Sequence, residues 1–488
     1  MPRALLFALA VSGAASANLN PNNPTWWDKY QYLQQNGSAP FAAAPAVSGG
    51  ANVDVSNECG PQSETFIAID PAHPKILAGG SNEIFRDPMR GYFSTDGGAS
   101  WGGVDLPLPS TKGTNSIDFG SDPSLAFDHA GNLYYSYIVV FFGGGAGVNG
   151  TEMAVARSLD GGKSYPQVTF FSPSSGSDHF NDKPMIAADA NASSPHAGNV
   201  YVAWDAASGG SAGGGIRFGR STDHGQTFTV TRIDNPTGPG RSIGSTVAVG
   251  PNGEVYVAWN DYTAGSIVLN SSTDGGVTFG APRTIARQSI GFQINIPAQF
   301  NRGALLYPSC GVDSSAGPHR GRVSCSYMNL NIGGNTDIFV VTSDDGGHSF
   351  SAPVAATDGL GGVDRFNQWL AVDPITGEVI MSFYDTRNDT SGARIEFDTY
   401  LARSTDGGTS FGPNLRASTT TSNEHDCGGV FPCASINYGN QTGDYEAVAA
   451  YGGTVHPIWT SSTRNRQNTA TCGPRGSMEE VFSAAIKY

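Results

Sequence analysis

A short motif occurs six times along the chain and constrains the fold more than any other feature of the sequence. Each copy reads Ser-x-Asp-x-Gly-x-Ser/Thr-aromatic, and successive copies begin 51 to 71 residues apart. The copies are STDGGASW (94–101), SLDGGKSY (158–165), STDHGQTF (221–228), STDGGVTF (272–279), SDDGGHSF (343–350) and STDGGTSF (404–411). An Asp carboxylate can accept backbone N–H groups two or three residues further on, and Gly permits a positive φ, so each copy predicts a tight turn. Six spaced copies predict a repeat architecture.

A second pattern precedes each copy of this motif. It is an apolar run that ends near an Asp, then a turn, then a run rich in β-branched and aromatic residues. The instances cover residues 65–71, 123–137, 184–204, 246–259, 308–327 and 368–384, and a seventh at 446–459 lacks the Asp turn and is followed by a last strand at 479–488. Each unit therefore predicts a two-stranded hairpin, a loop, a third strand, the Asp turn and a fourth strand.

These units predict an all-β fold, a β-propeller built from four-stranded antiparallel blades. Seven blades are favoured because the seventh unit is visible without its Asp turn, and six blades are the alternative. Only 14% of the residues are charged and 65 are Gly, which fits many tight turns and few amphipathic surface helices. The first and last blades must meet so that the ring has no free edge.

The N-terminus has the pattern of a secretory signal peptide at residues 1–17: a positive residue, an apolar run and the small-residue cleavage site Ala-Ser-Ala. We expect a secreted, extracellular protein whose mature chain starts at Asn18. An N-terminal arm and linker at 18–58 would then precede a single propeller at 59–488. Six sequons would be glycosylated in a eukaryotic source: Asn36, Asn149, Asn191, Asn270, Asn388 and Asn440.

The six cysteines, an even number, predict three disulfides in an oxidising compartment. Cys310 and Cys325 fall on the two predicted strands of one hairpin, and this is the favoured pair. The pairing of the other four stays open. Cys427 and Cys433 lie in one loop, and Cys59 and Cys472 could join the first blade to the last.

The Asp turns join the third and fourth strands of each unit, so they lie on the face opposite the loops around the central funnel, where propellers usually bind ligands. We therefore interpret the six Asp carboxylates as structural. The candidate catalytic residues on the funnel side are Asp182, Asp364, Asp385, Asp444, Glu446, Tyr384 and Tyr445. The candidate substrate-binding residues are His179, Lys183, Arg241, Arg302, Arg365, Gln368 and Arg387.

This inventory has the groups that a glycosidase needs. Paired carboxylates can act as acid and base or nucleophile, Arg can hold a substrate carboxylate, and Tyr beside an acid can assist. Taken alone, each such residue is more often a turn cap or an inter-blade salt bridge, and His179 is more often a wall residue than a metal ligand. Other polar residues at comparable strand ends are Glu64, Asn82, Arg86, Asp205, Asp261, Tyr307 and Asn367.

The six Asp turns resemble the Asp-box, or BNR repeat, of the sialidase superfamily, from about residue 59 to the C-terminus. The resemblance implies a propeller. It does not imply one activity, because the same motif occurs in arabinanases, xyloglucanases, lyases and lectin-like proteins. The strings DTR (385–387) and GDY (443–445) are similar to those of secreted sialidase-like proteins. The Arg-Ile-Pro motif of true sialidases is absent, and the nearest string, FRDP (85–88), lies too close to the first copy, so the sialic-acid arginine triad is not carried over.

The resemblance and the inventory together predict an exo-acting glycoside hydrolase on an acidic, plant or microbial glycan. The alternatives are a polysaccharide lyase, with His179 or a Tyr as base, and a non-catalytic propeller that binds glycan or protein. The net charge of −15 argues against nucleic acid and anionic membranes as partners. We expect a carbohydrate partner, a monomer and no required cofactor, although a ring of axial acids could hold Ca²⁺.

Overall fold

The computed structural model describes residues 29–30, 33–34, 37–38, 52–56, 61–109, 116–143, 148–175, 179–208, 215–234, 242–359, 361–425, 441–462 and 479–488. Nearly all regular structure in these ranges is β-strand. No helix in the described part of the chain is long and apolar enough to cross a membrane. The strands form seven antiparallel sheets of four or five strands, which confirms the favoured count of seven blades.

The first three blades run in chain order from the innermost strand outward. Blade 1 contains β2 (Gln62–Ile69), β3 (Leu77–Glu83), β4 (Arg90–Ser94) and β5 (Gly102–Asp105). Blade 2 contains β6 (Ser116–Phe127), β7 (Leu133–Gly143), β8 (Val148–Ser158) and β9 (Gln167–Ser175). Blade 3 contains β10 (His179–Ala188), β11 (Val200–Ser208), β12 (Ile216–Ser221) and β13 (Thr229–Arg232).

The next three blades repeat this order. Blade 4 contains β14 (Ser242–Val249), β15 (Val255–Asp261), β16 (Ser266–Ser272) and β17 (Arg283–Arg287). A separate hairpin, β18 (Gln293–Ile296) and β19 (Gln299–Leu305), follows it. Blade 5 contains β20 (Ser309–Val312), β21 (Val323–Leu330), β22 (Thr336–Ser343) and β23 (Val354–Ala355). Blade 6 contains β24 (Arg365–Val372), β25 (Val379–Asp385), β26 (Glu396–Ser404), β27 (Leu415–Arg416) and β28 (Ser422–Asn423).

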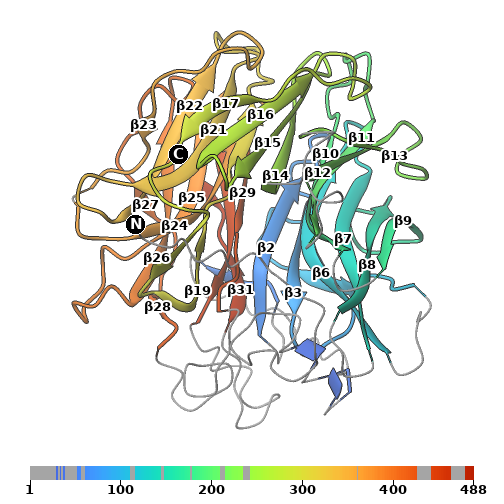
Figure 1. The fold of residues 1–488 in the computed structure, drawn as a ribbon, viewed down its shortest axis with the longest axis horizontal. Helices are drawn as coiled ribbons and strands as arrows, with labels where there is room; N and C mark the ends of the chain where they lie inside the picture. The colour runs from blue at the N-terminus through green and yellow to red at the C-terminus, as the bar shows by residue number, and fades with distance from the viewer. Residues whose placement is uncertain are drawn as a thin grey trace.

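The seventh blade closes the ring with strands from both ends of the chain. It contains β29 (Ala447–Tyr451), β30 (Thr454–Ser461), β31 (Glu480–Ser483), β32 (Ile486–Lys487) and, outermost, β1 (Val53–Asp54). The predicted arm therefore contributes a strand to the propeller, ahead of the start expected at residue 59. Figure 1 shows the blue first blade beside the red last one, and β2 contacts β29 directly.

The innermost strands stand around the axis of the propeller. Each contacts its neighbour in the order β2, β6, β10, β14, β20, β24, β29 and back to β2. The second strands behind them are packed on both faces, which explains their continuous apolar runs rather than a strict alternation. Trp204, Trp259 and Trp459 end three of these runs and are at most 2% exposed. The core therefore lies between the blades.

The Asp turns join the third and fourth strands, as predicted. In the second copy, Asp160 Oδ1 accepts the Ser164 amide at 2.9 Å and the Ser158 hydroxyl at 2.8 Å, while its Oδ2 accepts the Ser164 hydroxyl at 2.6 Å. Ser158 Oγ in turn accepts the Gly162 amide at 2.9 Å. These donors lower the pKa of Asp160 below its usual range, although partial burial opposes the shift. The carboxylate is thus fully used in building the turn.

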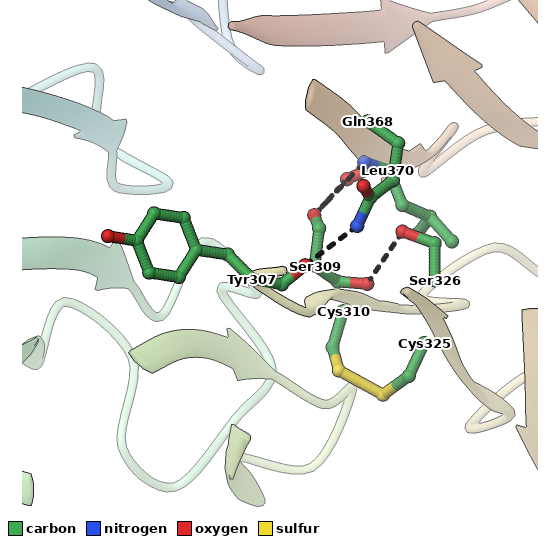
Figure 2. The surroundings of a disulfide bond; sticks show 7 residues. All are labelled: Tyr307, Ser309, Cys310, Cys325, Ser326, Gln368 and Leu370. Carbon is green, nitrogen blue, oxygen red and sulfur yellow. Dashed lines mark hydrogen bonds between the residues drawn. A yellow bond between two sulfur atoms is a disulfide. The ribbon is translucent and has the colours of Figure 1, made fainter. Parts of the chain in front are cut away.

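The hairpin of β20 and β21 contains the one disulfide in the described part of the chain. Cys310 and Cys325 are paired directly across the two strands and are bonded, which confirms the favoured pairing. Ser309, next to Cys310, accepts the Leu370 amide at 3.0 Å from blade 6 (Figure 2). Cys59, Cys427, Cys433 and Cys472 lie outside the described residues.

Candidate active site

A local irregularity recurs where the innermost strands begin, on the face opposite the Asp turns. Five of these strands carry a β-bulge in the pairing with their second strand, and one residue in each bulge has a left-handed backbone. The five residues and their φ angles are Glu64 (55°), Asp122 (61°), Lys183 (47°), Gly244 (69°) and Asn367 (51°). Four are not glycine, and each such residue costs about 1–3 kcal/mol. Bulges re-aim side chains and are frequent beside active sites.

Blade 5 supplies an equivalent position without the left-handed turn. Tyr307 precedes Pro308 and Ser309, just as Asp122 precedes Pro123 and Ser124. The equivalence is supported by two matching hydrogen bonds to the next blade: Ser124 Oγ accepts the Ile186 amide at 3.1 Å, as Ser309 Oγ accepts that of Leu370. The Tyr307 ring points away from the disulfide (Figure 2).

Two glycines make room for the side chains of neighbouring blades. A Cβ on Gly244 would lie 1.8 Å from a ring carbon of Tyr307, and one on Gly443 would lie 2.4 Å from Glu64 Cγ. Any side chain at position 244 would therefore displace Tyr307, and any side chain at position 443 would displace Glu64. Because Gly244 and Gly443 have no side chains, Tyr307 and Glu64 can pack directly over the backbone at these two positions.

Side chains from six blades and from the β18–β19 hairpin meet at this end of the axis. We call the group the axial cluster. It comprises Glu64, Asp122, Asp182, Lys183, Asp205, Arg302, Tyr307, Trp369, Asp444 and Tyr445. Two predicted catalytic residues, Asp182 and Asp444, belong to it, and so do Tyr445, Lys183 and Arg302.

The carboxyl groups of blades 1 to 3 are linked in a chain. Asn82 Nδ2 donates to Glu64 Oε2 at 2.6 Å, and Asn82 Oδ1 accepts the Asp122 amide at 2.7 Å. Asp122 Oδ2 accepts the Lys183 amide at 3.0 Å. The Asp122 carboxyl lies close to the side chains of Glu64 and Asp182 and contributes to the raised pKa of both.

Burial and crowding raise the pKa values of these acids. Desolvation is the largest cause for Glu64 and Asp182, whose pKa values lie well above the usual range, and nearby carboxylates add to both shifts. Burial also raises the pKa of Asp205 to about 7, although the Gly244 amide, which donates to its Oδ2 at 2.6 Å, and Lys183 oppose the shift. Protonated and ionisable carboxyls therefore coexist near neutral pH.

Asp182 and Asp205 are the two carboxyls of the axial cluster that strand register brings together. They are directly opposite each other in the β10–β11 ladder, where side chains of opposed residues lie on the same face. Asp205 Oδ1 has no hydrogen-bond partner among the described residues. Asp182 is half-buried, whereas Asp205 is 1% exposed.

Arg302 and Asp444 close the cluster from the side of blade 7. The Arg302 guanidinium donates two hydrogen bonds of 2.5 Å to the two Asp444 oxygens, and Glu64 Oε1 lies 3.9 Å from it. Tyr307 Oη donates to Asp444 Oδ2 at 3.4 Å. Gln441 Oε1 accepts the Arg302 amide at 3.1 Å, so the hairpin is fixed across the ring to blade 7.

The environment of Lys183 differs from that of Arg302, the other cation of the axial cluster. Its Nζ lies over three aromatic rings, 4.2 Å from the ring centre of Tyr307, 4.9 Å from that of Tyr445 and 5.5 Å from that of Trp369. It has no hydrogen-bond partner among the described residues, and Lys183 is 3% exposed. Burial lowers the pKa of Lys183 to about 8, against the attraction of the surrounding carboxylates.

A second group of predicted residues lies in blade 6, tied up in ion pairs. Asp385 is fully buried and bonds Arg365 Nε at 2.8 Å and Arg387 Nη2 at 2.7 Å. Asp364 bonds Arg394 at 2.8 Å. Both carboxylates are thus neutralised by arginine, in an arrangement that connects strands β24 to β26.

The remaining predicted residues are scattered. Tyr384 and Glu446 are 1% exposed, and Tyr384 Oη donates to the Thr460 carbonyl at 2.8 Å, between blades 6 and 7. Gln368 Nε2 donates to the Tyr307 carbonyl at 2.7 Å (Figure 2), and Tyr445 Oη donates to the Pro123 carbonyl at 3.2 Å. His179 belongs to β10, but its side chain is outside the described part, as is all of Arg241.

Asp122 and Glu64 were not among the residues assigned a catalytic or binding role from sequence. The signal for Asp122 is the Pro that follows it, because Asp122-Pro123, Lys183-Pro184 and Tyr307-Pro308 each precede the apolar part of an inner strand. Glu64 lacks such a Pro. Only its contacts with other blades distinguish it from an ordinary strand residue.

Metal binding has little support in the part of the chain that the structure describes. No group of three or more His, Cys, Asp or Glu side chains there has an arrangement that could hold an ion. In the axial cluster, oxygens of Glu64, Asp444 and Asp122 accept hydrogen bonds from Asn82, Arg302 and the Lys183 amide.

Comparison with known proteins identifies no family. No protein-family model and no curated protein sequence matches the chain. Among solved structures, it is similar to Hadza microbial sialidase Hz136, with 15% identity and a TM-score of 0.44 over 66% of this chain and 63% of that chain.

Two further solved structures have comparable scores. The intramolecular trans-sialidase from Ruminococcus gnavus matches with 14% identity and a TM-score of 0.46 over 70% of this chain and 94% of that chain. The GH93 α-L-arabinofuranosidase of Fusarium graminearum matches with 14% identity and a TM-score of 0.45 over 68% of this chain and 92% of that chain. Values this low assign no activity to the chain.

Proposed function

We propose that this chain is a carbohydrate-active hydrolase, a glycosidase whose reacting carboxyls lie in the axial cluster. The observation that carries the proposal is the pair Asp182 and Asp205, which oppose each other across β10 and β11 without an ion pair to arginine among the described residues. Glycoside hydrolysis needs one protonated and one ionised carboxyl on either side of the scissile bond.

The environments of the two carboxyls assign their roles. The pKa of Asp182 is raised well above its usual range by burial and by Asp122, so Asp182 is the proton donor to the leaving oxygen. Burial raises the pKa of Asp205 to about 7, and one of its oxygens has no partner among the described residues, so Asp205 is the base or nucleophile. Asp444 is held on both oxygens by Arg302 and takes no part in proton transfer.

A binding propeller without catalysis is the second candidate. It is favoured by the arginine partners of Asp364, Asp385 and Asp444, since carboxylates tied in this way cannot act as acid or base. Asp182 and Asp205 are outside that pattern, and for this reason hydrolysis is preferred. A lyase would need a base such as His179 or a Tyr, but Tyr445 already donates to a backbone carbonyl.

The test is a substrate screen with isosteric variants. The protein is incubated with sialosides, uronate-containing glycans and arabinans while released sugar and absorbance near 235 nm are followed. We expect released sugar without the unsaturated product, and a loss of roughly 100-fold or more in kcat for Asp182→Asn and Asp205→Asn. Asp261→Asn is the control, because Asp261 only caps its own turn. A wild-type protein that binds a glycan without releasing product would leave the binding propeller as the function.

We also propose that the chain is secreted and acts outside the cell as a monomer. The support is the N-terminal pattern of residues 1–17 and the disulfide in blade 5. N-terminal sequencing of the protein from the culture medium should begin at Asn18. A protein retained in the cells with an intact N-terminus would contradict the proposal.

A further inference from the structure

Lys183 is a buried ammonium whose Nζ lies over three aromatic rings and has no hydrogen-bond acceptor among the described residues. Cation–π contacts offset part of the desolvation cost, but they supply no acceptor for these donors. A buried donor left without an acceptor costs about 1–3 kcal/mol, and more when it is charged. An arriving ligand oxygen would relieve this cost.

Three of the arginines expected to hold an acidic sugar lie in the described part of the chain, and they already have partners. Arg302 is bound to Asp444 through two hydrogen bonds, and Arg365 and Arg387 both bind Asp385. A ligand carboxylate could recruit them only by breaking buried ion pairs, which is strongly unfavourable. Lys183 is therefore the cation of the axial cluster that is ready to receive an anion.

We propose that Lys183 binds the carboxylate of an acidic sugar, a uronic or sialic acid residue, and so sets the substrate class of the site. This inference rests on the proposed hydrolase function, because it places the sugar beside Asp182, the neighbour of Lys183 in β10. The geometry agrees: the half-buried Asp182 lies at the outer side of the cluster, and the Lys183 Nζ lies among the Tyr307, Trp369 and Tyr445 rings.

The charges around Lys183 determine when such a ligand can bind. The acids that act on it are Asp205, Asp444, Asp122 and Glu64, from four different blades. Asp444 is neutralised by Arg302, and burial raises the pKa of Glu64 well above its usual range. As pH rises through about 7, Asp205 becomes ionised, and through about 8, Lys183 loses its proton. Both changes make the site more negative, so both weaken the binding of a ligand carboxylate.

The experiment is calorimetric titration with glucuronate, N-acetylneuraminate, glucose and acetate at pH 5, 7 and 9. We expect a sugar acid to bind, glucose and acetate to bind much more weakly, and the affinity to fall steadily from pH 5 to 9. Lys183→Met should weaken sugar-acid binding roughly 10- to 100-fold, as expected for a lost charged hydrogen bond. Lys163→Met is the matched control, since Lys163 is exposed in an Asp turn on the opposite face.

Three outcomes would overturn the inference: glucose bound as tightly as the sugar acids, unchanged binding in Lys183→Met, or equal affinity for acetate. Thermal melting of the variant confirms that it is folded, so a loss of binding is not a loss of structure. Sugar-acid binding without hydrolysis would refute only the proposed function. Hydrolysis of neutral glycans unaffected by Lys183→Met would refute only this inference.

Discussion

At the scale of single residues, the site depends on side chains that the backbone holds in strained positions. Glu64, Asp122, Lys183 and Asn367 all have positive φ, a conformation that glycine would adopt at lower cost. Glycine at these positions would relieve the strain, but it would also remove the side chains that make the contacts near the propeller axis. The strain recurs at one register position in four blades, and Glu64, Asp122 and Lys183 reach the axial cluster from that position.

The ion pair of Arg302 and Asp444 gives the clearest prediction for a single residue. Asp444→Asn leaves the guanidinium, whose side chain is 15% exposed, without its carboxylate. Removing one partner of a buried pair costs about 3 kcal/mol, so chemical denaturation should show a loss near that size. The double variant Arg302→Met/Asp444→Asn should lose less than the sum of the single variants. Additive losses would mean that the pair does not stabilise the fold.

Sequence reasoning at this scale was partly sufficient. It nominated Asp182, Lys183, Arg302, Asp444 and Tyr445, and the structure brings all five together. The same argument predicted catalytic roles for Asp364 and Asp385, but these residues lie in blade 6, where each is paired with arginine. A polar residue at a strand end has the same appearance in the sequence whether a neighbouring blade supplies an arginine or not.

At the scale of elements, the Asp turn is an independent unit that stabilises one strand connection. Three hydrogen bonds reach the carboxylate of Asp160, two of them from Ser164. Because all of them are local in sequence, the motif identifies the turn wherever it occurs. This explains why the sequence predicted the turns and the strands beside them so well.

Removing one of these carboxylates should affect stability but not chemistry. Asp160→Ala loses three hydrogen bonds, and we expect the free energy of unfolding to fall by about 1–2 kcal/mol, less than three times a single bond because the site is exposed to water. Any catalytic rate should stay unchanged, since the turn lies on the face opposite the axial cluster. Lys163→Ala in the same turn is the control for a local sequence change, and an equal loss there would argue against the role of the carboxylate.

At the scale of the whole molecule, the ring is closed by a two-residue strand from the N-terminal arm. Beside β1, the Val55 amide donates to the Val481 carbonyl at 2.7 Å, and Ser56 Oγ donates to Glu480 Oε2 at 3.1 Å. The Ser56 hydroxyl also accepts the Val481 amide at 3.1 Å. The last blade therefore depends on residues more than 400 positions earlier in the chain.

Truncation tests this closure. A chain that starts after Ser56 leaves the outer edge of β31 unpaired, and with at least three hydrogen bonds lost we expect at least about 3 kcal/mol less stability and a tendency to aggregate through that edge. Thermal melting and size-exclusion chromatography measure both effects. A chain that starts at Ala51 retains β1 and is the control. Equal melting temperatures for the two truncated chains would show that β1 is dispensable.

Buried acids predict how stability depends on pH. Burial raises the pKa values of Glu64, Asp182 and Asp205 in the folded state above those of the unfolded chain. Such groups favour folding at low pH, and this contribution is lost as pH rises from about 4 through the folded pKa values. The Asp turns act in the opposite sense, since hydrogen bonds lower the pKa of Asp223 and of Asp406 to about 2 despite opposing desolvation. That stabilisation is lost below about pH 4.

The melting temperature should therefore be highest near pH 4 to 5 and decline toward pH 7. Differential scanning calorimetry from pH 2 to 7 measures the profile. Asp205→Asn should flatten the decline close to pH 7, where the wild-type carboxyl titrates. A maximum at or above pH 7 would show that the axial acids do not control stability.

The sequence by itself determined the repeat: six Asp turns, seven strand units, and the pairing of Cys310 with Cys325. All of these depend on residues close together in the chain, where spacing and turn chemistry are sufficient. Only the tertiary structure decided which acids meet at the axis, that β1 closes the last blade, and that Lys183 lies among rings from three other blades. Those contacts arise from ring closure, which brings residues hundreds of positions apart within hydrogen-bonding distance, and no local pattern encodes them.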